Sequence, residues 1–144
     1  MKKWFFLLSI ISLNSFSQSN LEKFNSENKN NSPGEALDVS IIQLISNPEK
    51  YDGKIIYVEG FIKIEFEGTA LYLHQQDFEH RISKNAIWLN ISREDLYGLI
   101  NECSEKYGSI IGLFKSEPKG HFGMFSGTIT DINGIYPDDY FVKD

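Results

Sequence analysis

The sequence predicts a mainly-β domain built from three strands, a helix and two further strands, with one short helix before them. Three consecutive segments, residues 54–66, 69–74 and 86–91, alternate between apolar and polar side chains, as half-buried strands do. Their short connections indicate an antiparallel meander. The apolar spacing then changes to that of a helix, and it returns to alternation after Gly108.

Composition limits both the size of the protein and its partners. The chain has 144 residues, of which 41% are hydrophobic and 14% aromatic, which suits one folded domain. Its 20 acidic side chains exceed its 14 basic ones and give a formal net charge of -6. Phosphate groups are bound by lysine and arginine, so this balance argues against nucleic acids and anionic membrane surfaces as partners.

Residues 1–17 have the pattern of a secretory signal peptide. Two lysines precede a short apolar run, and Ser15 and Ser17 place small residues at the cleavage positions before Gln18. A membrane anchor is the alternative, but the run is too short to cross about 30 Å of hydrocarbon. We therefore expect an exported protein, periplasmic or extracellular, with no membrane span after cleavage.

The next segment, 18–35, is rich in asparagine, serine and charge, and this composition predicts a disordered spacer. A single barrel domain is expected from 36 to 144. Ser40 and Gln43 fit a capping box at the start of a short helix, which ends before Pro48 because a residue that precedes proline avoids helical backbone angles.

The first strand, 54–66, divides its side chains between two faces. Its inward face holds Ile56, Val58, Ile62 and Ile64, and its outward face holds Tyr57, Glu59, Phe61, Lys63 and Glu65. Gly60 interrupts the middle of this run, which is typical of a bulge or a sharp bend at a barrel corner.

A second helix is predicted to begin after Ser92 and to end at Gly108. Its apolar residues follow helical spacing and form one stripe: Leu96, Leu99, Ile100, Cys103 and Tyr107. This stripe predicts that Cys103 is a buried core residue rather than a reactive thiol. The remaining strands are expected over 109–115 and 124–132, with a hairpin near 120–123 and a turn-rich C-terminal segment that closes the barrel end.

Three strands, a helix and two strands are the element order of a five-stranded Greek-key barrel of the OB-fold type. An open antiparallel sheet with two helices on one side is the alternative. The chain also resembles small exported bacterial proteins with an OB-like barrel. Residues 48–60, Leu71–Tyr72 and 120–129 carry this resemblance, which extends over 39–132. Because these motifs consist of glycines and apolar residues, the resemblance implies a fold and no particular chemistry.

One surface is a candidate ligand site. OB-like barrels bind ligands across the outer face of strands two and three, and here that face would carry Tyr72, His74, Trp88 and Asn90. The inward positions are Leu71, Leu73, Ile87, Leu89 and Ile91. Aromatic and hydrogen-bonding groups together could stack on a base, a sugar or a peptide side chain. Alternatively, the N-terminal helix or the C-terminal tail covers Tyr72 and Trp88.

No pattern of residues indicates catalysis. The three histidines, His74, His80 and His121, lack metal-ligand spacing, and Glu65 with Glu67 has the pattern of a solvated turn. We expect no metal, no cofactor and no enzyme activity. The expected function is an exported binding module for a peptide, a glycan or an envelope protein. The alternative is a small acidic inhibitor or immunity-type protein that binds a basic partner.

Overall fold

A computed structural model describes residues 18–29 and 36–142. It contains a six-stranded sheet and five α-helices among these residues. The strands are β1 (Leu37–Val39), β2 (Ile55–Lys63), β3 (Ala70–Tyr72), β4 (Ala86–Leu89), β5 (Lys106–Lys115) and β6 (Thr128–Pro137). The α-helices are α1 (Asn20–Asn28), α2 (Ile41–Ser46), α3 (Pro48–Tyr51), α4 (Gln75–Glu79) and α5 (Arg93–Cys103). Two 3-10 turns, η1 (Ser83–Asn85) and η2 (His121–Gly123), complete the fold.

Five of the strands close into a barrel. β2, β3 and β4 form an antiparallel meander, β4 pairs with β6 in parallel, and β6 pairs with β5. The barrel closes because β5 also pairs with β2 along Ile55–Ile62. The predicted closed five-stranded barrel with a helix before its last two strands is therefore confirmed, and the open sheet is wrong. The helix count is a correction: the described residues contain five α-helices where two were expected, and one of them, α4, lies between β3 and β4 in a stretch expected to be a loop.

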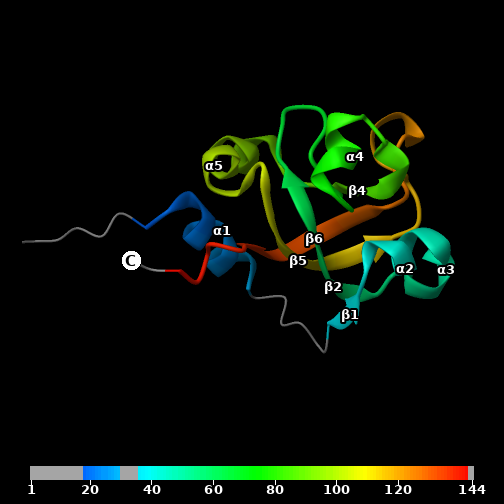
Figure 1. The fold of residues 1–144 in the computed structure, drawn as a ribbon. Coiled ribbons are helices and arrows are strands. Elements are labelled where there is room, and N and C mark those ends of the chain that lie inside the picture. The colour runs from blue at the N-terminus through cyan, green and yellow to red at the C-terminus, as the bar shows by residue number, and fades with distance from the viewer. Residues whose placement is uncertain (1–17, 30–35, 143–144) are drawn as a thin grey trace, which may run out of the picture.

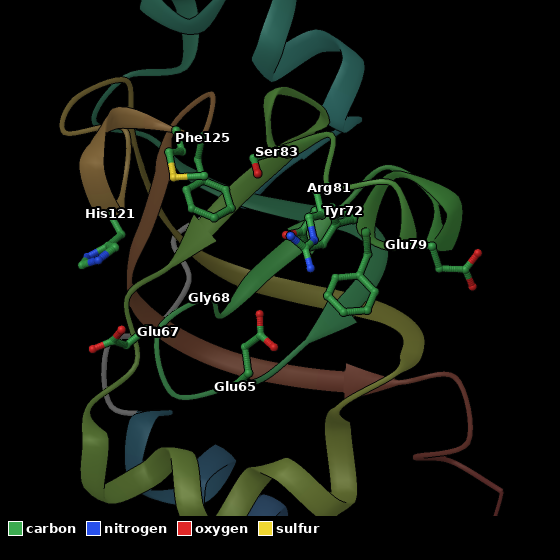
Figure 2. Close-up of a pocket in the computed structure, with 11 residues that line it drawn as sticks. Glu65, Glu67, Gly68, Tyr72, Glu79, Arg81, Ser83, His121 and Phe125 are labelled. Atoms are coloured by element: carbon green, nitrogen blue, oxygen red, sulfur yellow. The ribbon is translucent and has the colours of Figure 1, made fainter.

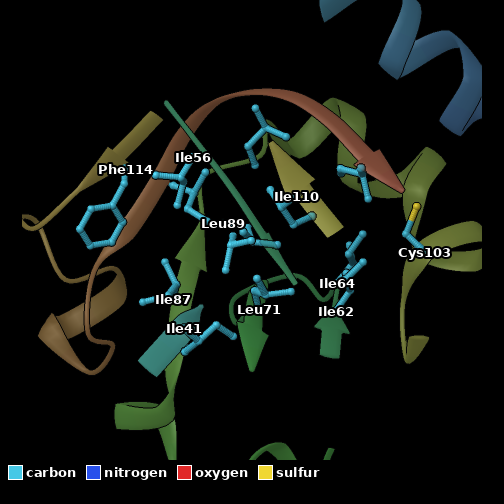
Figure 3. Packing of buried hydrophobic residues seen from close by; sticks show 14 of the residues in the cluster. Ile41, Ile56, Ile62, Ile64, Leu71, Ile87, Leu89, Cys103, Ile110 and Phe114 are labelled. Carbon is cyan, nitrogen blue, oxygen red and sulfur yellow. The ribbon is translucent and has the colours of Figure 1, made fainter. Parts of the chain in front are cut away.

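The interior of the barrel holds the side chains that alternation assigned to it. Ile56, Val58 and Ile62 are completely buried, as are Leu71 and Ile87 from the next two strands. Figure 3 shows Ile56, Ile62, Leu71 and Ile87 converging between the strands, with Cys103 at one end of the cluster. Cys103 has no exposed surface, which confirms the prediction of a core cysteine.

Helices cover the ends of the barrel. α2 and α3 lie together at one end, and α1 lies beside α5 and the C-terminal segment at the other (Figure 1). The capping box predicted at the start of α2 is present, because the Gln43 amide donates to the Ser40 hydroxyl and the Ser40 amide donates to the Gln43 side chain. The predicted cap of α5 is also confirmed, since the Ser92 hydroxyl accepts from the Asp95 amide.

The largest correction concerns the predicted spacer at 18–35. Residues Asn20–Asn28 form α1, which begins at a Ser19 cap and packs against α5 and β6. Leu21 and Phe24 join the barrel core, and the backbone amide of Asn20 donates to the Glu102 carboxylate at 2.9 Å. Specific partners on the barrel stabilise a segment whose composition alone favours disorder. The predicted signal peptide, 1–17, and the last part of the predicted spacer, 30–35, lie outside the described residues.

Other element boundaries also differ from the predictions. α5 ends at Cys103, and Tyr107 lies in β5 with 40% of its surface exposed, so it does not belong to the helix stripe. The last strand begins later than predicted and continues through Pro137, which places Ile135 inside the barrel sheet. An additional strand, β1, pairs in parallel with β2. Pairing with β2 and β5 determines where these strands begin and end. The local periodicity of the sequence does not reveal which strands pair.

A second apolar cluster lies outside the barrel. Phe61, Ala70, Tyr72, Ala86 and Phe125 are buried together, with Phe78 and Trp88 packed against them. The first four residues belong to the outer faces of β2, β3 and β4. α4 contributes Phe78, and the loop between β5 and β6 contributes Phe125. This outer cluster forms the base of the candidate site.

Candidate functional site: a pocket on the outer face of the barrel

The four residues of the predicted site do not share one surface. Tyr72 is only 5% exposed and Trp88 is half-buried, whereas His74 and Asn90 are exposed. Tyr72 lines one pocket, and Trp88 with Asn90 lines another. His74 lines neither, because it precedes α4, where its amide donates to the Asp77 carboxylate. Phe78 and Phe125 pack against this face, which differs from the expected cover by the N-terminal helix or the C-terminal tail.

The larger pocket, called the outer pocket below, has a volume of about 520 Å³. Three connections surround its β3 floor: the β2–β3 loop, the α4 segment and the β5–β6 loop (Figure 2). Its lining residues are Glu65, Glu67, Gly68, Tyr72, Phe78, Glu79, Arg81, Ser83, His121, Met124 and Phe125. The pocket thus occupies the outer face of the second barrel strand, where a ligand site was expected, although most of its lining comes from the connections.

Aromatic side chains form the floor. The Tyr72 and Phe78 rings meet edge to face with their centroids 5.5 Å apart, and Phe78 also lies 6.2 Å from Phe61. Burial raises the pKa of the Tyr72 phenol, the nearby Glu65 carboxylate raises it further, and a hydrogen bond with Ser83 opposes both effects. The phenol therefore stays protonated at neutral pH and can donate a hydrogen bond.

Charged side chains of both signs enter the pocket above this floor. Figure 2 shows the Glu65 carboxylate and the Arg81 guanidinium pointing into the same space from opposite sides. No ion pair joins these two groups. The Glu65 carboxylate lies close to the backbone of Gly68, where a Cβ atom would meet it. Glu79 points away from the pocket centre and accepts a hydrogen bond from Gln75.

Asp77 fixes the α4 segment that contributes Arg81. One carboxylate oxygen of Asp77 accepts from the His74 amide at 3.1 Å, and the other accepts from the Asn85 side chain at 2.9 Å. Asp77 is only 8% exposed, so these bonds are shielded from water. The Ile82 amide donates to the Asp77 carbonyl at 2.7 Å, which closes the turn after α4 around Arg81.

The β5–β6 loop forms an apolar rim. Phe122 is 86% exposed and Met124 is 49% exposed, and Met124 lines the pocket. The His121 ring lies beside Phe122 with centroids 4.0 Å apart. Large apolar side chains that remain exposed next to a pocket are typical of binding surfaces.

A second hollow of about 420 Å³ lies on the other side of the β5–β6 loop. Trp88, Asn90, Lys115, Pro118, Gly120, His121, Thr128 and Thr130 line it. The Trp88 ring lies nearly parallel to the His121 ring at 6.1 Å and meets Phe125 edge to face at 5.3 Å. His121 lines both hollows, so the β5–β6 loop separates two surfaces that the sequence pattern treated as one.

Sequence reasoning missed Glu65, Arg81 and Phe125. It interpreted Glu65 with Glu67 as a solvated turn, although Glu65 points into the outer pocket. The β5–β6 loop was identifiable from the known position of ligand sites in OB-like barrels, which loops flank. The position of Arg81 depends on the turn after α4, and the sequence contains no motif that predicts this turn.

Among residues 18–29 and 36–142, no group of three or more histidine, cysteine, aspartate or glutamate side chains could hold a metal ion. Within the same ranges, no helix has the length and apolar character needed to cross a membrane.

Fold and site together define a small closed β-barrel with a charged pocket above an aromatic floor. No model of a protein family matches this sequence, and neither a curated protein nor a solved structure matches it.

Proposed function

We propose that this protein is an exported, non-catalytic binding module with an OB-like barrel, and that it binds a short peptide segment in the outer pocket. The strand pairings support the assignment of the barrel. β4 pairs in parallel with β6, β5 closes on β2, and α5 connects the third and fourth barrel strands, which is the arrangement of an OB-like barrel.

The location of the outer pocket is the observation that carries the proposal. OB-like barrels bind ligands over strands two and three, between the loop that joins strands one and two and the loop that joins strands four and five. The outer pocket lies over β3 between the corresponding loops, 64–69 and 116–127. An apolar floor with a few polar groups above it is the usual composition of a ligand site.

The lining favours a peptide over other ligands. Tyr72, Phe78 and Phe125 offer an apolar floor for a side chain, and the charged groups above them can bind polar parts of a peptide. Three carboxylates in the lining disfavour a nucleic acid strand. Ser83 is the only serine in the lining, and among the described residues its hydroxyl makes no hydrogen bond to a basic side chain, which favours binding over nucleophilic catalysis.

An NMR titration of the exported protein tests the proposal, with a pool of tripeptides that have phenylalanine at the centre and varied ends. We expect shifts of the amide signals of Glu65, Tyr72 and Phe125. Met124→Ala should weaken binding, because Met124 lines the pocket, while Tyr97→Ala on α5 should leave it unchanged as a matched control of an exposed apolar residue. Absence of shifts around the outer pocket would reject the proposal. A trimer of N-acetylglucosamine that shifts Trp88 and Asn90 instead would favour a glycan ligand.

Export is tested separately by sequencing the N-terminus of the secreted chain. We expect the first residue within about two positions of Gln18, because Ser15 and Ser17 are the small residues that signal peptidase selects. Recovery of intact Met1 in the membrane fraction would contradict export by this route.

A further inference from the structure

Arg81 occupies a backbone position that favours glycine. It directly follows His80, the C-cap of α4, and has a φ of 57°. Its amide donates to the Phe78 carbonyl at 3.0 Å, while the next amide, that of Ile82, donates to Asp77. These two bonds define a Schellman motif, in which glycine is the usual residue at the left-handed position. A side chain with a Cβ atom is strained there, as at Glu105, Phe122 and Asp131, which also have positive φ.

Among the residues that the structure describes, neither Arg81 nor Glu65 has an ion pair for its charge. Within the described part of the chain, the Arg81 guanidinium makes no ion pair or side-chain hydrogen bond. The Glu65 carboxylate has no ion pair in these residues either. Both groups point into the outer pocket over the aromatic floor (Figure 2).

We propose that the outer pocket selects ligands that carry an ammonium group and a carboxylate group a short distance apart, with Arg81 binding the carboxylate and Glu65 binding the ammonium. This inference rests on the proposed function and specifies the ligand class. An apolar side chain between the two charged groups of the ligand lies on Phe78 and Phe125.

The cost of removing charges from water decides among ligand classes. In the free protein Arg81 is exposed and Glu65 is half-buried. A ligand seated between them displaces water from both groups, and a charge that loses water without gaining a partner is unfavourable. A purely cationic ligand compensates Glu65 and leaves Arg81 without a partner. A purely anionic ligand compensates Arg81 and leaves Glu65 without a partner. A ligand with both charges compensates both groups, and the planar arginine fork can hold a carboxylate through two hydrogen bonds.

Two sources can supply this chemistry. A short peptide with free ends has its own ammonium and carboxylate groups, while an internal protein segment presents them on lysine and glutamate side chains. The experiment therefore begins by measuring the binding of two probes by calorimetry: Ala-Phe-Ala with free ends, and Lys-Phe-Glu with acetyl and amide blocks. Binding of the first probe identifies chain ends as the ligand, and binding of the second identifies an internal segment.

The decisive measurement combines a change in the protein with a change in the ligand. Arg81→Gly should weaken binding of the better probe by about 10- to 100-fold, because a hydrogen-bonded charge pair is lost. Replacing the ligand carboxylate by an amide should weaken binding to the unchanged protein by a similar factor. In Arg81→Gly the amide probe should bind no more weakly than the parent probe, because both changes remove the same interaction. For Glu65→Gln, a probe whose ammonium group is acetylated or otherwise made neutral should bind no more weakly than the parent probe, because both changes remove the same interaction.

Stability provides a second readout. Arg81→Gly should raise the melting temperature by about 2–5 °C, because glycine relieves the left-handed strain. Asp131→Gly is the matched control, since Asp131 also has a positive φ, of 46°, and does not line the outer pocket. It should raise the melting temperature without changing affinity.

If the losses of affinity caused by Arg81→Gly and by removal of the ligand carboxylate were additive, the proposal would be overturned. A melting temperature of Arg81→Gly below that of the natural protein would also overturn it. Failure of both charged probes, while the tripeptide pool still shifts Tyr72 and Phe125, would reject the ligand class and leave the proposed function intact. Failure of the pool as well would reject the proposed function itself.

Discussion

The side-chain amide of Asn25 pairs with the peptide group of Ile135 as a neighbouring strand would. Its Nδ2 donates to the Ile135 carbonyl at 2.9 Å, and its Oδ1 accepts from the Ile135 amide at 2.9 Å. Asn25 is 3% exposed, so water does not compete for these bonds. A helix is thereby attached to the edge of β6 through one side chain, and residues 110 positions apart in the sequence are joined.

Asn25→Ala should lower the free energy of unfolding by about 2–4 kcal/mol, because two buried backbone groups of Ile135 lose their partners. Urea denaturation measures this change. Asn28→Ala is the matched control on the same helix, since Asn28 bonds only the Phe24 carbonyl one turn away and should cost less than about 1 kcal/mol. Equal losses in the two variants would contradict a docking role for Asn25.

This pair also explains why the sequence predicted a spacer where α1 lies. The segment has two large apolar residues, Leu21 and Phe24, and asparagines that usually favour turns and disorder. The helix is ordered because Asn25 bonds to β6 and because the Glu102 carboxylate accepts hydrogen bonds from the first amides of the helix. Such contacts depend on the finished barrel, and composition within the segment does not reveal them. By contrast, alternation and capping residues are local signals, and they predicted the barrel strands and the starts of α2 and α5.

Cys103→Ser should destabilise the fold by about 1–3 kcal/mol, because a hydroxyl replaces a thiol that has no exposed surface. Cys103→Ala is the control that removes the sulfur without adding a polar group, and it should cost less than the serine variant if polarity is the cause. Bulky thiol reagents should label the native protein slowly. Rapid labelling of the folded chain would contradict burial.

The same thiol should make stability fall at alkaline pH. Burial raises the pKa of Cys103 to about 12 from an ordinary value of 9.0, and the Glu102 carboxylate adds to the rise. Below pH 9.0 both folded and unfolded chains keep the proton, and this residue adds no pH dependence. Between the two values the unfolded chain loses its proton first, so the free energy of unfolding decreases as pH rises.

Urea midpoints of the natural protein and of Cys103→Ala, measured at about pH 8 and about pH 10.5, test this expectation. The natural protein should lose more stability between these conditions than Cys103→Ala does, because titration of tyrosines and lysines is common to both chains. Parallel losses would mean that the thiol titrates normally in the folded state.

Alternation also predicted the candidate site in part. It placed Tyr72 and Trp88 correctly on the outer side of their strands, opposite Leu71 and Ile87. It did not indicate how much of each ring the connections cover. Phe78 and Phe125 come from polar segments, and only the folded paths of these segments bring them onto Tyr72 and Trp88. A charge such as Arg81 is positioned in the same way, by a turn whose residues include no glycine.

Trp88→Ala should cost about 1–3 kcal/mol, less than the loss of a fully buried tryptophan, because the ring is half-buried against His121 and Phe125. Phe122→Ala in the adjacent loop is the control and should change stability by less than about 0.5 kcal/mol, since Phe122 is 86% exposed. After removal of residues 1–17, Trp88 is the sole tryptophan, and acrylamide should quench it partially. Complete protection from acrylamide would mean a buried ring and no open surface at Trp88.

Gly120 and Gly123 form a matched pair for the β5–β6 loop, which separates the two hollows. Both have positive φ angles, 64° and 66°, but their surroundings differ. A Cβ atom at Gly120 would lie 2.7 Å from Cβ of Trp88 and 2.8 Å from Cδ2 of Phe125, whereas a Cβ atom at Gly123 would meet nothing within 4 Å. Gly123→Ala should therefore cost about 1 kcal/mol for backbone strain alone.

Gly120→Ala adds a collision with the two rings, and its φ of 64° with a ψ of -157° places it in a backbone region that essentially only glycine adopts, so it should cost about 2–4 kcal/mol in total. It should also move the Trp88 ring away from Phe125, which shifts the tryptophan emission and the amide signals along β4. Because Phe125 forms part of the floor of the outer pocket, Gly120→Ala should weaken peptide binding in the folded protein, while Gly123→Ala should preserve it. Denaturation in urea followed by tryptophan emission measures the two stabilities in one experiment. If the two variants lost equal stability and kept the same emission, close packing of Gly120 against Trp88 and Phe125 would be wrong, and the β5–β6 loop would not hold the pocket floor in place.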